Sequence, residues 1–243
     1  MSGHSKWSTI KRKKAVMDAK RGKIFTTLIK EITVAARRGG GDETSNPRLR
    51  QAIQNARAAN MPQENIKRAI MRGTGELPGV NYEEATYEGY GPGGVAILME
   101  VLTDNRNRAV AEIRHIMTKH GGHLGENGSV AWMFETRGQI TIPRENLDED
   151  TLLEVALECG ADDVTVEDEV YLLSTSPGKL MPVREQLEAQ GYTIDSAQVE
   201  KIPKTLQKVQ GSTAEQVLSL LEALADHDDV KNVFANVDLE ETS

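Results

Sequence analysis

Apolar and charged positions repeat with helical spacing in the first third of the chain. From residue 18 to residue 37, one helical arc collects the apolar side chains Ile24, Phe25, Leu28, Ile29 and Ile32. Lys23, Lys30 and Arg37 recur every seventh residue on roughly the opposite arc, with Lys20 beside them. This pattern predicts an amphipathic helix whose apolar face packs and whose basic face points outward.

Two further helices are expected before residue 75. Three glycines end the first helix, and Asn46 followed by Pro47 is a typical helix start. The second helix carries Arg50 and Arg57, seven residues apart on one side, and a third helix ends at Gly73. Residues 1–75 are therefore predicted to form a small three-helix domain.

Residues 137–202 follow a different pattern. Their apolar segments predict strand, helix, strand, strand, helix and strand, the order of the ferredoxin-like βαββαβ unit. The flanking segments 82–134 and 212–237 are each too short to make a covered sheet. We therefore predict an α+β protein of three domains: residues 1–75, a discontinuous α+β domain of residues 76–136 and 203–243, and an inserted ferredoxin-like domain of residues 137–202.

The charges divide at the end of the helical segment. Residues 1–75 hold 17 Lys and Arg against 5 Asp and Glu, a net charge of +12. Residues 76–243 hold 12 against 32, a net charge of −20, and the two parts sum to the −8 of the whole chain. A segment that concentrates positive charge favours an anionic partner, and nucleic acid is the commonest such partner for a soluble chain.

The candidate nucleic-acid contacts are the basic side chains of this segment and its tryptophan, which can stack on an unpaired base. From the charge pattern they are Lys6, Trp7, Lys11, Arg12, Lys13, Lys14, Lys20, Lys23, Lys30, Arg37, Arg50 and Arg57. The alternative for the first residues is a solvated tail, with Trp7 folded back onto the helices. No definite helix-turn-helix pattern is present, so readout of a base sequence is not predicted.

A polar loop at residues 103–108 is the second-choice contact site. It joins a predicted strand to a predicted helix, and Asp104 or Asn105 is expected to cap that helix. Capping does not require Arg106 or Arg108. The glycine-rich segment 88–94 is predicted to be a turn, because a strand follows it where a phosphate loop needs a helix.

Other chemistry is not expected. The single cysteine, Cys159, excludes an internal disulfide and fits a reducing, cytoplasmic compartment, and no apolar run is long enough for a membrane span. His120 and His123 hint at a metal site, but glycines separate them and no cysteine is near. No hydrolase, zinc-peptidase or nucleotide-loop motif occurs. We expect a protein that is not an enzyme and has no metal, cofactor or small-molecule substrate.

Several separated motifs resemble the YebC/PmpR family, which is related to the mitochondrial translational activator of cytochrome oxidase. They span nearly the whole chain and occur in order, which makes the resemblance specific. The motifs are residues 3–7 (GHSKW), 18–25 (DAKRGKIF), 46–50 (NPRLR), 60–62 (NMP), 87–96 (YEGYGPGGVA), 102–108 (LTDNRNR), 121–126 (GGHLGE) and 132–134 (WMF).

The resemblance implies a three-domain cytoplasmic protein with a helical N-terminal domain. Family members are generally described as DNA-binding transcriptional regulators, whereas others act in translation on the ribosome, including relief of stalling at proline-rich stretches. Matching motif positions carry over a presumed nucleic-acid role to Lys6, Trp7, Lys20, Arg21, Lys23, Arg48 and Arg50.

Three functions stay open from the sequence. The first is a DNA-binding transcriptional regulatory protein, and the second is a translation factor that binds rRNA in the ribosome. The third is a protein-interaction scaffold, in which the basic face binds an acidic partner or the acidic part of a second copy.

Overall fold

The computed structural model describes residues 7, 9–10, 21–144, 148–167 and 169–239. The chain divides into two compact units. Among the described residues, one unit is Phe134–Lys204, and the other joins those before Phe134 to those after Lys204. The larger unit contains the basic helices and a mixed sheet-and-helix layer, so it holds every predicted contact residue that the structure describes.

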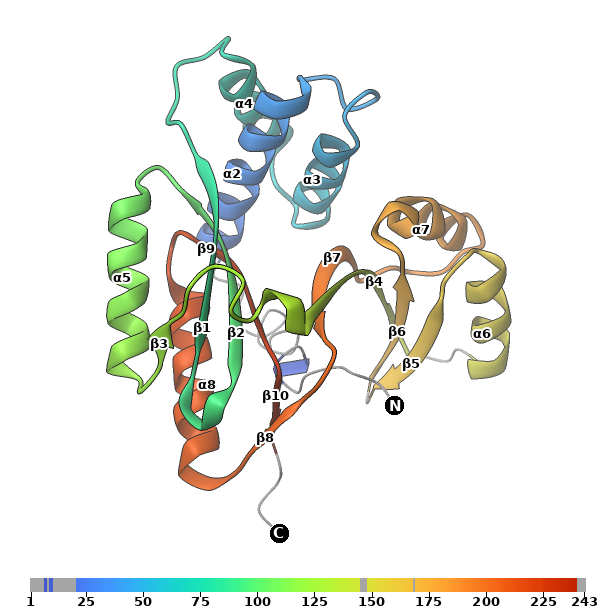
Figure 1. Ribbon diagram of the computed structural model, residues 1–243. Coiled ribbons are helices and arrows are strands. Elements are labelled where there is room, and N and C mark those ends of the chain that lie inside the picture. The colour runs from blue at the N-terminus through green and yellow to red at the C-terminus, as the bar shows by residue number, and fades with distance from the viewer. Residues whose placement is uncertain (1–6, 8, 11–20, 145–147, 168, 240–243) are drawn as a thin grey trace. The chain divides into compact units, whose positions relative to one another are not determined.

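Three helices form the first part of the larger unit (Figure 1): α2 (Arg21–Gly39), α3 (Pro47–Ala58) and α4 (Gln63–Thr74). Asn46 caps α3, because its side chain accepts a hydrogen bond from the Leu49 backbone N–H. Ile32, Leu49 and Ile66 lie in a common apolar core that excludes water. The predicted three helices are thus present.

A four-stranded antiparallel sheet forms the second part of the larger unit, with strand order β3-β1-β2-β9. Its strands are β1 (Glu83–Tyr90), β2 (Ala96–Thr103), β3 (His123–Leu124) and β9 (Val230–Ala235). The helices α5 (Arg106–Lys119) and α8 (Gly211–Asp226) share one apolar core with this sheet. Two three-residue strands, β8 (Gln207–Val209) and β10 (Val237–Leu239), pair in parallel.

The glycine-rich segment is the turn between β1 and β2. It contains a short 3-10 turn, Pro92–Gly94, with Gly93 at φ +70° and Gly94 at φ +73°. Glycine adopts positive φ readily because it has no Cβ. The interpretation of this segment as a turn is therefore confirmed.

The smaller unit is a complete βαββαβ fold. In chain order it comprises β4 (Phe134–Pro143), α6 (Glu149–Glu158), β5 (Asp163–Glu167), β6 (Val170–Thr175), α7 (Leu180–Ala189) and β7 (Ser196–Pro203). The strands pair antiparallel in the order β5-β6-β4-β7, which is the ferredoxin-like order. The predicted fold class, an α+β protein with an inserted ferredoxin-like unit, is confirmed.

Candidate nucleic-acid interface

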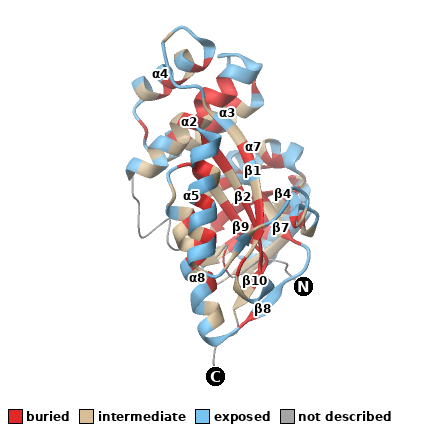
Figure 2. Cartoon of the chain, turned by 60° about the vertical axis from the view of Figure 1, so that its left-hand side comes forward, coloured by how far each residue is buried: buried red, intermediate tan, exposed pale blue. Residues whose placement is uncertain are grey.

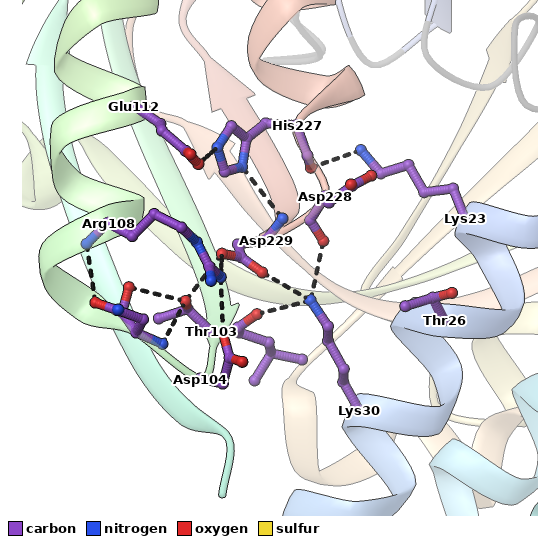
Figure 3. Close-up of polar contacts among 12 residues, drawn as sticks. Lys23, Thr26, Lys30, Thr103, Asp104, Arg108, Glu112, His227, Asp228 and Asp229 are labelled. Atoms are coloured by element: carbon purple, nitrogen blue, oxygen red, sulfur yellow. Dashed lines mark hydrogen bonds and ion pairs between the residues drawn. The ribbon is translucent and has the colours of Figure 1, made fainter. Parts of the chain in front are cut away.

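Lys30 lies buried between α2 and the sheet layer (Figure 3), although its helical position predicted an outward-facing charge. Its Nζ donates to Asp229 Oδ1 at 2.9 Å and to the carbonyls of Leu102 at 3.2 Å and Asp228 at 3.1 Å. These three bonds use every proton of the ammonium group. Only 6% of Lys30 is exposed, so the prediction that it contacts nucleic acid is wrong.

Asp229 is the centre of this buried polar cluster. Besides Lys30, it accepts hydrogen bonds at Oδ2 from Arg108 Nη2 at 2.8 Å and Thr103 Oγ1 at 2.9 Å. Burial opposes ionisation, but the bonds from Arg108, Lys30 and Thr103 outweigh it and lower the pKa of Asp229 to about 2. Arg108 also pairs with Asp104 at 2.7 Å, and its bonds to both carboxylates raise its pKa. The guanidinium of Arg108 is thus engaged within the protein.

Lys23 is the second lysine of α2 that binds the protein itself. Its Nζ donates to the carbonyl of Ala225 and, at 2.8 Å, to that of His227, so Lys23 caps the C-terminal end of α8. His227 Nδ1 accepts from the Asp229 N–H at 3.1 Å, and its Nε2 lies 2.8 Å from Glu112 Oε2. Because Nδ1 is an acceptor, Nε2 carries the proton and donates a hydrogen bond to the Glu112 carboxylate.

A cleft of about 760 Å³ opens beside these groups. Its charged lining holds five acidic and three basic side chains, so it does not form the continuous electropositive groove that a phosphate backbone requires. Its charged lining residues are Lys23, Lys30, Asp104, Arg108, Glu112, Asp226, Asp228 and Asp229.

Arg48 belongs to a second cluster of ion pairs between the helices and the sheet layer. It makes two hydrogen bonds with Glu84, one of them at 3.2 Å, and lies 3.6 Å from Glu31. Arg38 binds Glu84 at 2.6 Å, and Lys231 binds Glu31 at 3.0 Å. Burial alone would raise the pKa of Glu84, but Arg48 and Arg38 outweigh burial and lower this pKa overall. The Glu84 carboxylate therefore stays ionised. Arg48 was predicted to bind nucleic acid, and the structure pairs it instead with carboxylates.

The other predicted arginines of the helical part, Arg37, Arg50 and Arg57, differ in the hydrogen bonds and ion pairs that they make within the protein. Arg37 is exposed and donates to the side chain of Asn81. Arg50 donates through Nε to the Glu43 carbonyl at 3.0 Å and through Nη2 to a second loop carbonyl, so it holds the loop before α3. Arg57 is half-exposed and lies 3.7 Å from the Glu43 carboxylate, a distance typical of a weak surface pair. Arg37 and Arg57 therefore keep surface available for an external anion.

Trp7 is buried in the core of the sheet layer and is only 3% exposed. Its indole Nε1 donates to the Val233 carbonyl at 3.0 Å. A base can stack only on an exposed ring face, so the predicted stacking role of Trp7 is wrong. The alternative expected Trp7 to fold back onto the helices. The ring does fold back, but it packs with the sheet rather than with α2–α4.

The other predicted contacts cannot be placed. Six lie outside the described residues, and for Arg21 only the backbone is described. The six are Lys6, Lys11, Arg12, Lys13, Lys14 and Lys20.

The outward face of α4 carries basic side chains that the sequence prediction missed. Lys67, Arg68 and Arg72 are all exposed, while the opposite side of α4 approaches α2 at Gly73. Arg68 lies 3.5 Å from Glu64, one turn earlier, and no described residue binds the side chain of Lys67 or Arg72. The helical spacing used for the first two helices would have found this face.

The 103–108 loop separates its two arginines. Asn105, one of the two predicted caps, accepts from the Arg108 backbone N–H at 3.0 Å and begins α5. Arg106 is exposed, whereas Arg108 holds Asp104 and Asp229. Only Arg106 therefore remains a candidate contact of this loop.

Within the described residues, no group of three His, Cys, Asp or Glu side chains is arranged to hold a metal ion. No described helix combines the length and apolar character needed to cross a bilayer.

These features define an α+β protein in which basic helices are ion-paired to an acidic sheet layer that carries an inserted βαββαβ unit. The chain belongs to the TACO1/YebC family. The model of the family's N-terminal domain matches residues 5–76, and the model of its second and third domains matches residues 82–237. The resemblance inferred from the motifs is confirmed.

Similar proteins cover almost the full chain. A protein of Dictyoglomus turgidum is 59% identical over 98% of this chain and 96% of its own length. One of Pelotomaculum thermopropionicum is 58% identical over 99% of this chain and 100% of its own length. Both are named "Probable transcriptional regulatory protein". The crystal structure of a conserved hypothetical protein from Aquifex aeolicus has a TM-score of 0.85 at 49% identity and covers 93% of both chains.

Proposed function

We propose that this protein is a non-enzymatic, nucleic-acid-binding regulator of transcription that contacts DNA through its helical part in the cytoplasm. The names of its relatives support a regulatory role. The observation that carries the proposal is the exposed basic face of α4, formed by Lys67, Arg68 and Arg72. Lysine and arginine side chains free to reach solvent neutralise phosphates and release counterions, which favours binding.

The internal ion pairs restrict this proposal to part of the basic segment. Lys23, Lys30 and Arg48 bind carbonyls and carboxylates of the same chain, so they contribute little to an external site. The same pairs weaken the hypothesis of a protein-interaction scaffold. That hypothesis needs an acidic partner for the basic face, whereas acidic groups of the same chain already pair with these basic side chains. Within the part of the basic segment that the structure describes, the outward face of α4, with Arg37 and Arg57, is what remains for a polyanion.

A translation factor that binds ribosomal RNA is the second candidate. The basic side chains of the outward face of α4, Lys67, Arg68 and Arg72, are of the types that contact backbone phosphates. Proteins recognise folded RNA largely by shape and backbone, so such a face suffices without a helix that reads bases.

Binding assays with two triple variants test the proposal. The α4 variant replaces each basic residue of the face with glutamine: Lys67→Gln, Arg68→Gln and Arg72→Gln. A charge control removes the same net charge at exposed positions outside the helical part: Lys179→Gln, Lys204→Gln and Lys208→Gln. Fluorescence anisotropy with a duplex DNA and an RNA hairpin, from about 0.05 to 0.5 M salt, measures the affinity of each variant and its salt dependence.

We expect the α4 variant to bind more weakly than the charge control, with a salt slope lower by about 0.9 for each phosphate that is no longer neutralised. DNA preferred over RNA supports the transcriptional role, and RNA preferred over DNA supports the ribosomal one. If the α4 variant and the charge control bind alike, the outward face of α4 is not the interface. If the unmodified protein binds neither probe, the proposed function is wrong.

A further inference from the structure

One of the two tryptophans of the chain is exposed to solvent. Trp7 is only 3% exposed, whereas Trp132 is 66% exposed, and no large hydrophobic side chain among the described residues is more exposed. Trp132 belongs to the short 3-10 turn η2 (Ala131–Met133), which comes after β3 in the chain. The strand β2, by contrast, is buried at every position except Glu100 (Figure 2). Packing in the sheet layer therefore does not account for the indole of Trp132.

The loop that carries Trp132 is held in place by Glu88. The carboxylate of Glu88 accepts hydrogen bonds from the backbone N–H groups of Gly128, Val130 and Ala131, each at 2.7 Å. Val130 is fully buried and anchors the same segment. The backbone next to Trp132 is thus ordered before a ligand binds, which lowers the entropic cost of binding.

Two further aromatic side chains are linked to Trp132. Trp132 Nε1 and the Tyr90 hydroxyl both donate to the carbonyl of Ser129, at 3.0 Å each. Tyr90 and His123 lie directly opposite each other on β1 and β3, and their ring centroids are 5.7 Å apart. Tyr90 is half-buried and His123 is exposed. Tyr90, His123 and Trp132 together are called the aromatic patch.

The chemistry of the aromatic patch suits a flat, unsaturated ligand. The indole N–H of Trp132 and the hydroxyl of Tyr90 donate within the protein, so these side chains offer ring surface to a ligand. Residues 126–129 (ENGS) of the same loop are polar or glycine, unlike the aliphatic lining of a groove that docks an apolar helix. Unpaired nucleobases stack on Trp, Tyr and His rings.

The charge of this region determines how such a ligand can bind. Residues 76–243 carry a net charge of −20, so this part of the chain does not attract phosphates. A base must therefore gain its affinity from contact with the rings. Stacking neutralises no phosphate and releases no counterion, so its contribution depends little on salt.

We propose that the aromatic patch is a stacking site for unpaired bases of single-stranded DNA or RNA. The inference rests on the proposed function, because it adds base contacts to the same class of ligand and leaves the phosphates to the outward face of α4. Every base has a flat π face, so the site binds bases without reading their sequence.

Two substitutions of Trp132 in the full chain test the patch. Trp132→Leu removes the ring and Trp132→Phe keeps a ring, while both remove the hydrogen bond to Ser129. Because Trp132 is exposed, both variants should keep the Tm of the unmodified protein. Fluorescence anisotropy measures their binding to single strands of about 12 adenine nucleotides, one of DNA and one of RNA. A strand of abasic nucleotides with the same number of phosphates is the control ligand.

We expect Trp132→Leu to bind the adenine strands about tenfold more weakly than Trp132→Phe, with the same salt slope. The α4 variant should instead have a lower salt slope. The unmodified protein should prefer the adenine strands to the abasic strand by a similar factor. The adenine strand with the larger difference between the two variants identifies the ligand as DNA or RNA.

Intrinsic fluorescence gives a second readout. A base stacked on Trp132 quenches its emission, whereas the buried Trp7 keeps its own. The adenine strands should therefore quench the unmodified protein and leave the emission of Trp132→Phe unchanged. The abasic strand should quench neither protein.

Four results overturn the inference. If Trp132→Leu and Trp132→Phe bind the adenine strands equally while the α4 variant loses affinity, the patch is not a contact and the proposed function stands. If the abasic strand binds as tightly as the adenine strands, the protein holds the backbone and not the bases. If a leucine-rich amphipathic peptide quenches Trp132 and the single strands do not, the patch serves a protein partner. If the unmodified protein binds no duplex, hairpin or single strand, the proposed function fails and the stacking site fails with it.

Discussion

Replacing Asp229 with asparagine removes the negative charge at the centre of the buried cluster and keeps the shape of the side chain. The Lys30 ammonium, 2.9 Å from Asp229 Oδ1, would then face a neutral amide. Removing one partner of a buried, hydrogen-bonded pair leaves the other desolvated without compensation. We therefore expect Asp229→Asn to destabilise the larger unit.

The size of the effect follows from the pKa of Asp229. The network lowers this pKa from 3.8 to about 2, and each pH unit corresponds to about 1.4 kcal/mol. The ionised form of Asp229 thus contributes about 2 kcal/mol to the free energy of unfolding at pH 7. Because the pKa is lower in the folded state, this contribution is present above about pH 4 and is lost as the pH falls toward 2. At pH 3 the difference between the two proteins should shrink to about 1 kcal/mol.

Tryptophan fluorescence during urea unfolding can report on the larger unit alone. Of the two tryptophans, Trp7 is 3% exposed in the core beside Val233, and Trp132 is 66% exposed. A Trp132→Phe background therefore leaves Trp7 as the single probe of the sheet layer.

Two results would refute the reasoning about Asp229. Equal stability of the Asp229→Asn protein at pH 7 would mean that the charge contributes nothing. A gap of about 2 kcal/mol that persists unchanged at pH 3 would mean that ionisation of Asp229 is not its source.

Three other substitutions or reagents probe single features of the fold. Glu88 accepts backbone N–H bonds from the loop 125–133 at 2.7 Å, which lower its pKa against the effect of burial. Glu88→Gln should therefore cost about 1–3 kcal/mol and speed proteolysis of that loop, and an unchanged cleavage rate would contradict this. A Cβ at Gly73 would lie 2.5 Å from the Thr33 carbonyl oxygen, so Gly73→Ala should destabilise the α2–α4 crossing by about 1–3 kcal/mol, and an unchanged Tm would count against it. Burial raises the pKa of Cys159, so its thiol should react with Ellman's reagent at pH 7 more slowly than after unfolding. Equal reaction rates in the folded and unfolded protein would contradict this protection of the thiol.

Local patterns in the sequence were sufficient to predict most of the fold. The apolar spacing of α2–α4 and the βαββαβ order of the smaller unit depend on neighbours within a few residues, which periodicity records well. The pairing of β8 with β10 could not be predicted in this way. Each strand has three residues, too few for an alternating pattern, and the partners are 30 residues apart.

The candidate site was harder to predict. A helical wheel identifies the side of a helix that packs in the local core, but it does not show whether the other side faces solvent or a distant part of the chain. Lys23 and Lys30 do point away from the α2–α4 core, as predicted, but the sheet layer covers them. The acceptors of Lys30 lie at positions 102, 228 and 229, so no local pattern could reveal the pairing. Trp7 illustrates the same limit, since its hydrogen-bond acceptor is 226 residues away.

The ends of the smaller unit meet at one place. Phe134 and Pro203 are direct register partners on β4 and β7, which places their Cα atoms about 5 Å apart. A linker of one or two residues can therefore close the chain from Met133 to Lys204 after the whole βαββαβ unit is deleted. The same closeness allows the unit to be grafted into a surface turn of an unrelated host, so it can be exchanged between proteins as a cassette.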